Sequence, residues 1–152
     1  VERAKRHAID SYLFDTANNE NTIKTESDLV GLLKQYKIDW ILLLGYTKKI
    51  GPKLLTAFNN RIINTHPSLL PKYGGKGFYG RKIHEAVLAS GDILTGATVH
   101  MVNEEYDSGE ILGQIEVPVL PKDSIKTLEA RVKKTEKAHL VSVLNELWKN
   151  EN

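Results

Sequence analysis

The sequence contains no cysteine among its 152 residues, which excludes disulfide bonds and thiolate metal sites within it. It has no apolar run of the ~20 residues that a membrane-spanning helix requires, and no basic-then-apolar leader. Its charges nearly balance, with 21 basic and 19 acidic residues, so nothing in the net charge favours a nucleic-acid partner. Its histidines and carboxylates show no metal-ligand spacing. We therefore expect a cytoplasmic protein that acts on small molecules, without membrane, nucleic acid or metal.

The hydrophobic pattern predicts an α/β fold, and 152 residues are most simply one domain. Five stretches have the apolar content and length of strands: residues 8–14, 39–45, 61–65, 95–102 and 111–119. Five others have the apolar spacing, charge pattern or capping residues of helices: residues 2–7, 25–37, 52–58, 81–90 and 124–148. Residues 15–24 are polar and are predicted to be a loop.

Two of the predicted strands have their carboxyl ends where a ligand would bind. The run from Asp39 to Gly45 is continuously apolar, which is typical of a parallel strand buried on both faces. The short helix after it leads to the strand over residues 61–65, so the three elements predict a βαβ unit. Because ligands bind at the carboxyl ends of such strands, Gly45 and His66 are expected to face one crevice.

The polar motif with the most chemical content follows directly on that second strand. Asn64 and His66 lie two residues apart, so on an extended segment their side chains point to the same side. The amide is a fixed hydrogen-bond donor, and the imidazole changes protonation near neutral pH. Taken alone, the pair is explained equally well as a strand-end amide beside a surface histidine. Pro67 favours the functional interpretation because it fixes the backbone where the imidazole must be aimed.

A carboxylate from a distant loop would complete this set. Asp107 belongs to an Asp-Ser-Gly turn, and by itself such a turn has an ordinary structural explanation. Amide, imidazole and carboxylate together are what acyl transfer to an amine needs. His100 is interpreted as a core histidine or one that supports the site, whereas His84 and His139 show no partner spacing.

The glycine-rich stretch over residues 73–80 is not a phosphate-binding loop. It lacks the Gly-Lys-Ser/Thr ending, and a proline-bearing segment precedes it instead of a strand. We interpret it as a mobile lid near the site.

Three stretches together resemble the folate-dependent formyltransferase family: HPSLLPKYGGKG (66–77), HEAVLASGD (84–92) and TGATVHMVNEEYDSGEIL (95–112). Within it, the sequence is most similar to the enzymes that formylate glycinamide ribonucleotide, from about Asp39 to the C-terminus. The Asn-x-His-Pro-Ser-Leu-Leu-Pro run followed by the Asp-x-Gly loop is highly specific for this family. The resemblance implies a Rossmann-like fold, with a mostly parallel sheet flanked by helices and the first strands absent.

The resemblance also implies an activity and a set of site residues. The reaction is formyl transfer from 10-formyltetrahydrofolate to the glycinamide amine in purine biosynthesis, with no metal and no covalent enzyme intermediate. Asn64 and His66 would stabilise the oxyanion, and Asp107 would keep His66 protonated and assist proton transfer through water. By position, the folate site would comprise Thr47, Lys48, Lys49, Ile50, Asn64, Asn103, Glu104, Glu105, Tyr106 and Asp107. The second substrate would contact Gly45, Pro67, Lys133 and Glu136.

The sequence departs from the family at its start. The family begins with a strand and a Gly-Ser-Asn turn that grips the substrate phosphate at a helix start. This sequence begins at Val1 without either, so we interpret it as a fragment or a reduced homologue with an exposed sheet edge. The sequence does not decide whether the protein forms a homodimer.

Related activities are alternatives to this one. A formyltransferase acting on a sugar nucleotide or on methionyl-tRNA is one alternative, although the latter usually has Arg-Gly where this chain has Tyr73-Gly74-Gly75. A deformylase typically has a second histidine at the position of Pro67. A non-catalytic folate-binding remnant is the alternative from another class.

Overall fold

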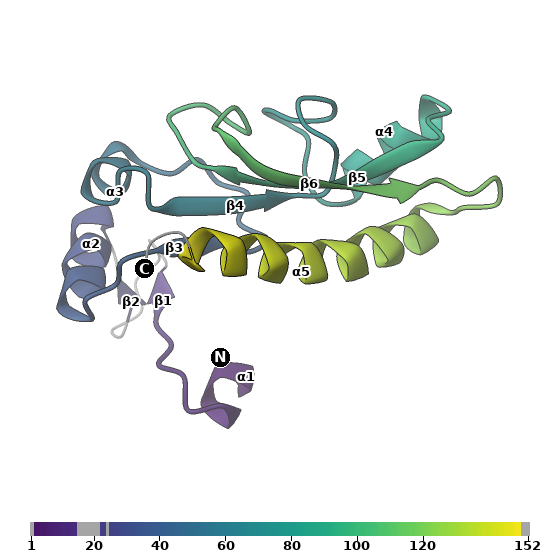
Figure 1. Ribbon diagram of the computed structural model, residues 1–152. Helices are drawn as coiled ribbons and strands as arrows, with labels where there is room; N and C mark the ends of the chain where they lie inside the picture. The colour runs from purple at the N-terminus through teal and green to yellow at the C-terminus, as the bar shows by residue number, and fades with distance from the viewer. Residues whose placement is uncertain (1, 15–21, 24, 150–152) are drawn as a thin grey trace.

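The computed structural model describes residues 2–14, 22–23 and 25–149 (Figure 1). Its helices are α1 (Glu2–Arg6), α2 (Glu26–Gln35), α3 (Pro52–Ala57), α4 (Arg81–Ala89) and α5 (Ile125–Lys149). Its strands are β1 (Leu13–Phe14), β2 (Thr22–Ile23), β3 (Ile41–Leu43), β4 (Ile62–His66), β5 (Leu94–Met101) and β6 (Ile111–Pro118). The α/β class and the predicted helices are confirmed. Most of the predicted 15–24 loop lies outside the described residues, and its described part forms β2.

Four strands form the main sheet in the order β3-β4-β5-β6. β3 pairs with β4 in parallel, as the predicted βαβ unit requires, while β4 with β5 and β5 with β6 are antiparallel. The described sheet is therefore mixed, and the expectation that most of it is parallel is wrong. The loop of residues 102–110 explains part of this difference, because so short a connection joins β5 to β6 only as an antiparallel neighbour.

The most buried strand is β5, not β3. Six consecutive residues of β5, Thr95 to His100, are buried, so both of its faces are covered. The three residues of β3 are only partly buried, and Leu44 directly after it is 65% exposed. The 39–45 run packs on both faces, with Ile41 and Leu43 against one core cluster and Leu42 against another. It is less buried than predicted, and within the described chain β3 lies at an edge of the main sheet.

The predicted strand over residues 8–14 is mostly absent. Only Leu13 and Phe14 form strand, paired in parallel with β2 in a separate two-stranded sheet. Leu13 is 50% exposed and Ile9 is 61% exposed, so this apolar stretch has little described structure to pack against. Its apolar residues predicted a strand, but strand length depends on neighbours that local composition does not specify.

Helix α5 runs along the main sheet and packs against β5 and β6 (Figure 1). Val143 and Leu144 of this helix join Ile63 and Val99 in one core cluster, and each such buried side chain contributes ~1.5–3 kcal/mol. The start of the helix is fixed by Arg131, which donates to both carboxylate oxygens of Asp123 at 2.7 Å. These bonds hold the pKa of Asp123 well below its usual range. The helix is thereby anchored to the turn that precedes it.

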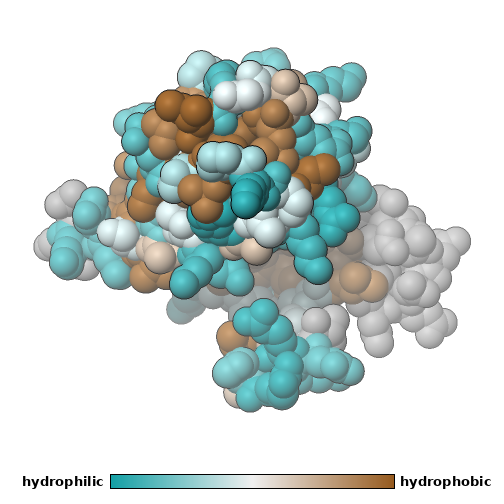
Figure 2. Space-filling view, turned by 90° about the vertical axis from the view of Figure 1, so that its right-hand side faces the viewer, coloured by the Kyte–Doolittle hydropathy of each residue, from teal (hydrophilic) through white to brown (hydrophobic). Residues whose placement is uncertain are grey.

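Apolar side chains also reach the surface where β5 begins and β6 ends. Ile93 is 79% exposed and Leu120 is 49% exposed. Figure 2 views the molecule from the right-hand side of Figure 1 and shows hydrophobic side chains gathered among hydrophilic ones. Within the described ranges, no helix combines the length and apolarity needed to cross a bilayer.

Candidate active site

Two neighbouring strands bring three polar side chains together. Asn64 and His66 lie at the carboxyl end of β4, two residues apart on one face, as the alternation predicts. His100 of β5 is directly opposite Asn64 in the antiparallel register. On its other side, the pairing of β5 with β6 shifts register between Val99 and His100, and such irregularities commonly occur beside active sites. The strands therefore place an amide between two imidazoles.

Asp107 reaches this group from the loop between β5 and β6. Its φ is +52°, a left-handed conformation that is uncommon for residues with a side chain but that Asp tolerates better than most. Two contacts hold the loop that carries it. Asn103 accepts hydrogen bonds from the Glu105 amide and the Ser108 hydroxyl, both at 3.0 Å. Gly109 packs so closely on β5 that an added Cβ would lie 1.8 Å from the Met101 carbonyl oxygen.

The imidazole of His66 lies between two acceptors. Its Nδ1 is 3.4 Å from Asp107 Oδ1, and its Nε2 donates to the Tyr73 carbonyl oxygen at 2.7 Å. His66 is 4% exposed, so water does not readily replace either partner. Because a carboxylate and a carbonyl both accept, the surroundings match a ring that carries hydrogen on both nitrogens. A ring protonated in this way would place a positive charge beside the Asn64 amide.

His100 holds the other side of the cluster. Its Nδ1 donates to the Met101 carbonyl oxygen at 2.8 Å, which leaves Nε2 to face Asn64 Nδ2 at 3.2 Å and Asp107 Oδ1 at 3.6 Å. It is 2% exposed. The prediction of a core or supporting histidine fits this position. Among the described residues, the second N–H of the Asn64 amide has no acceptor, so it is available to a ligand.

These contacts set the charge of Asp107. Burial acts to raise its pKa, but the neighbouring His100 and His66 rings, the charge of His66 and the hydrogen bond from the Gly75 amide at 2.9 Å outweigh burial. The pKa of Asp107 therefore lies well below its usual range, and the group is a carboxylate at neutral pH. A carboxylate here can stabilise a protonated imidazole and accept a proton through water.

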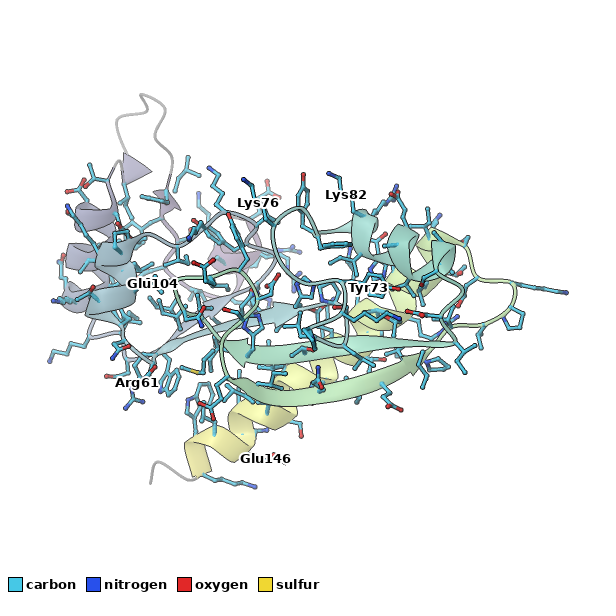
Figure 3. All side chains as sticks on the ribbon, turned by 90° about the horizontal axis from the view of Figure 1, so that it is seen from above. Arg61, Tyr73, Lys76, Lys82, Glu104 and Glu146 are labelled. Carbon is cyan, nitrogen blue, oxygen red and sulfur yellow. The ribbon has the colours of Figure 1, made fainter. Side chains whose placement is uncertain are left out.

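The cluster opens into a pocket of about 850 Å³, within the range of small-molecule sites. Fourteen of the predicted site residues line it: Gly45, Thr47, Lys48, Lys49, Ile50, Asn64, His66, Pro67, Asn103, Glu105, Tyr106, Asp107, Lys133 and Glu136. Of the predicted site residues, all within the described ranges, only Glu104 is not at the pocket; its side chain is exposed on the loop (Figure 3). The roles of these residues stay predictions. Of the predicted lid, residues 73–80, the part from residue 75 to residue 80 also lines the pocket.

Sequence reasoning missed three groups at this site. Two are main-chain groups, the Tyr73 carbonyl that faces His66 and the Gly75 amide that faces Asp107. The third is His84 of α4, which is buried and lines the pocket, and whose pKa is lowered by burial. Helical apolar spacing around His84 was the available signal, since it places the ring on the inner face of α4. In the described part of the chain, no group of three or more His, Cys, Asp or Glu residues is arranged to hold a metal ion.

Known proteins resemble this chain over nearly its whole length. The Formyl transferase family matches residues 1–144. A chloroplastic phosphoribosylglycinamide formyltransferase of Vigna unguiculata is 45% identical over 97% of this chain and 47% of its own length. The phosphoribosylglycinamide formyltransferase of Bacillus subtilis is 34% identical over 97% of this chain and 73% of its own length. The crystal structure of phosphoribosylglycinamide formyltransferase from Streptococcus pneumoniae superposes with a TM-score of 0.85 at 35% identity, covering 97% of this chain and 79% of that one.

The chain spans about half the length of the plant relatives that it matches. The matched region contains the strand end with Asn64 and His66, the loop with Asp107 and the pocket that they share. On this sequence match and structural superposition, the chain belongs to the formyl transferase family.

Proposed function

We propose that the protein transfers a formyl group from 10-formyltetrahydrofolate to the amine of glycinamide ribonucleotide. The observation that carries this proposal is the cluster at the pocket: a buried imidazole beside a carboxylate at 3.4 Å, with an amide on the same strand face. Several relatives of this chain bear the name phosphoribosylglycinamide formyltransferase, which supports the choice of amine.

The cluster has the groups that this transfer needs. As the amine attacks the formyl carbon, a C–N bond forms and negative charge develops on the formyl oxygen. The free N–H of Asn64 would donate to that oxygen, and one such donor lowers the barrier by ~3–4 kcal/mol. Protonated His66 would add a positive charge next to it, because both of its nitrogens already face acceptors.

Asp107 would accept the proton that the amine loses. The attacking amine must lose one proton, and the departing folate nitrogen must gain one when its bond to the formyl carbon breaks. A carboxylate that stays ionised at neutral pH can accept the first through a water molecule, and a positioned acid or base is worth ~10²–10⁴-fold in rate. The protein forms no bond to the formyl group in this scheme.

The pocket walls fit two substrates on either side of this cluster. One wall comprises residues 45–50 and the loop carrying Tyr106, where we place the folate, bound largely through main-chain groups. The opposite wall is α5, where Lys133 and Glu136 offer a cation and a carboxylate to the phosphate and hydroxyl groups of a ribonucleotide. In this proposal both partners are small molecules and the reaction takes place in the cytoplasm, although two curated relatives carry the word chloroplastic in their names.

A direct assay of the full-length protein tests the proposal. Radiolabelled 10-formyltetrahydrofolate would be supplied with glycinamide ribonucleotide, a sugar-nucleotide amine, methionyl-tRNA or no amine. We expect label in formylglycinamide ribonucleotide at a rate at least 100-fold above the other three reactions. Faster transfer to another amine, release of formate without amine, or folate binding without any transfer would each contradict the proposal.

A further inference from the structure

One short segment contacts both charged members of the cluster. The carbonyl of Tyr73 accepts from His66 Nε2 at 2.7 Å, and the amide of Gly75 donates to Asp107 Oδ2 at 2.9 Å. Residues 73–75 therefore bridge the imidazole and the carboxylate through main-chain atoms alone. A shift of this segment would move both hydrogen bonds together.

The segment is itself held from its far side by the side chain of Tyr73. The phenolic hydroxyl donates to Asp92 Oδ2 at 2.7 Å and also lies 2.5 Å from Ser90 Oγ. Ser90 and Asp92 belong to the turn between α4 and β5, and Asp92 is fixed by Lys72 Nζ at 2.6 Å. Figure 3 shows Tyr73 between α4 and the sheet. The phenol thus joins the site segment to a turn outside the pocket.

The backbone of Tyr73 needs such a restraint. Its φ is +57°, a left-handed conformation that costs ~1–3 kcal/mol for a residue with a side chain. This conformation directs the carbonyl of Tyr73 at His66. The ring also meets Phe78 edge to face at 6.0 Å and packs against the core cluster that contains Val87. Packing fixes the plane of the Tyr73 ring, while the hydrogen bonds of its hydroxyl fix where the ring lies along the turn.

We propose that the Tyr73 hydroxyl, clamped by Asp92 and Ser90, is a positioning group that sets the orientation of the His66 imidazole through the Tyr73 carbonyl. The catalytic part of this inference rests on the proposed formyl transfer. The structural part, the coupling of the phenol to the imidazole, does not. Without the hydroxyl, the backbone of Tyr73 can relax from its left-handed conformation. Its carbonyl then moves away from His66 Nε2, and His66 loses one of its two acceptors.

The test uses Tyr73→Phe, which removes only the hydroxyl, and Asp92→Ala, which removes its acceptor and leaves Tyr73 intact. Tyr36→Phe is the matched control, because Tyr36 hydrogen-bonds Tyr12 and does not line the pocket. The first readout is the ¹⁵N NMR signal of the His66 ring in each variant of the chain. The second is kcat and KM of the full-length protein with the proposed substrates.

We expect the Nε2–H signal of His66 to shift or to broaden by exchange in both Tyr73→Phe and Asp92→Ala, and to stay unchanged in Tyr36→Phe. We expect kcat to fall about tenfold with KM for both substrates within twofold, since small misplacements of catalytic groups are costly. Unchanged His66 signals in both variants would overturn the inference, as would a loss expressed only in KM. A full-length protein without transfer activity, but with the NMR change, would refute the proposed function and leave the coupling standing.

Discussion

Two parts of the pocket lining, a buried wall and an exposed wall that differ from the two proposed substrate sides, are built in opposite ways. The wall formed by β4, β5 and Asp107 is buried, and His66, His100 and Asp107 each have at least two partners within the protein. The wall formed by residues 45–50 and 75–80 is mostly exposed, and glycines with positive φ at 45, 75, 77 and 80 interrupt it. By this contrast, the groups proposed for chemistry are fixed before substrate arrives, whereas the groups proposed for recognition keep freedom to adapt.

The largest effect is expected on the buried wall. We predict that Asn64→Ala, His66→Ala and Asp107→Ala each reduce kcat of the full-length protein by ~10²–10⁴-fold, because each removes a donor, a charge or a proton acceptor from the transition state. Steady-state assays with circular dichroism as a folding check would measure this. Glu146→Ala, an exposed change on α5, is the control (Figure 3). Near-native turnover of the Asp107 variant would show that the assigned proton role is wrong.

The next largest effect is expected on stability, and it compares Gly109, which is tightly packed, with Gly31, which has open space around it. In Gly109→Ala the new Cβ would lie 1.8 Å from the Met101 carbonyl oxygen, so the Asp107 loop or β5 must move. We predict a loss of ~1–3 kcal/mol in the free energy of unfolding, measured by urea denaturation. In Gly31→Ala, within α2, nothing lies within 4 Å of the new atom, and we predict a gain of ~0.5–1 kcal/mol. A similar change in both variants would contradict the close approach of this loop to β5.

The buried wall was largely predictable from the sequence, for identifiable reasons. Asn64 and His66 share a face because strand alternation has a fixed period, and Pro67 marked the end of the strand. Asp107 followed from the family resemblance, since its turn alone has a structural explanation. The contacts from Tyr73 and Gly75 were not predictable, because the direction of a main-chain group depends on the φ of a turn and not on residue type.

The fold was less predictable at its edges than at its centre. The apolar run of β3 indicated burial on both faces, and its residues do pack on two core clusters, but they stay partly exposed at the edge of the described sheet. The pairing direction of β5 was likewise set by how α4 returns the chain to the sheet, which hydrophobic periodicity does not encode. Helix positions were predicted well because capping residues such as Thr25 act locally.

A smaller effect is expected in acid, and it again concerns the buried wall. The pKa of Asp107 is below its usual range, so the carboxylate contributes stability that is present above the unfolded-state value of ~3.9. That contribution is lost as pH falls from this value through the lower folded-state pKa. We predict that wild type exceeds Asp107→Asn in unfolding free energy at pH 7, and that the difference shrinks below about pH 4. Urea titrations at several pH values measure it, and a difference that does not vary with pH would contradict the assignment.

The smallest effect is expected in the exposed wall, where ligands should change mobility without changing the fold. Few backbone hydrogen bonds hold residues 75–80, one of them from the Phe78 amide to the Gly75 carbonyl at 3.2 Å. We predict that amides of Lys76, Gly77 and Tyr79 exchange rapidly with solvent and slow by about tenfold when a folate analogue and the amine substrate both bind. The amides of Ile63 and Val99 in the buried strands are the internal reference, and their protection should not change. Equal exchange of residues 76–79 with and without ligands would remove the lid, and both walls would then be fixed before substrate arrives.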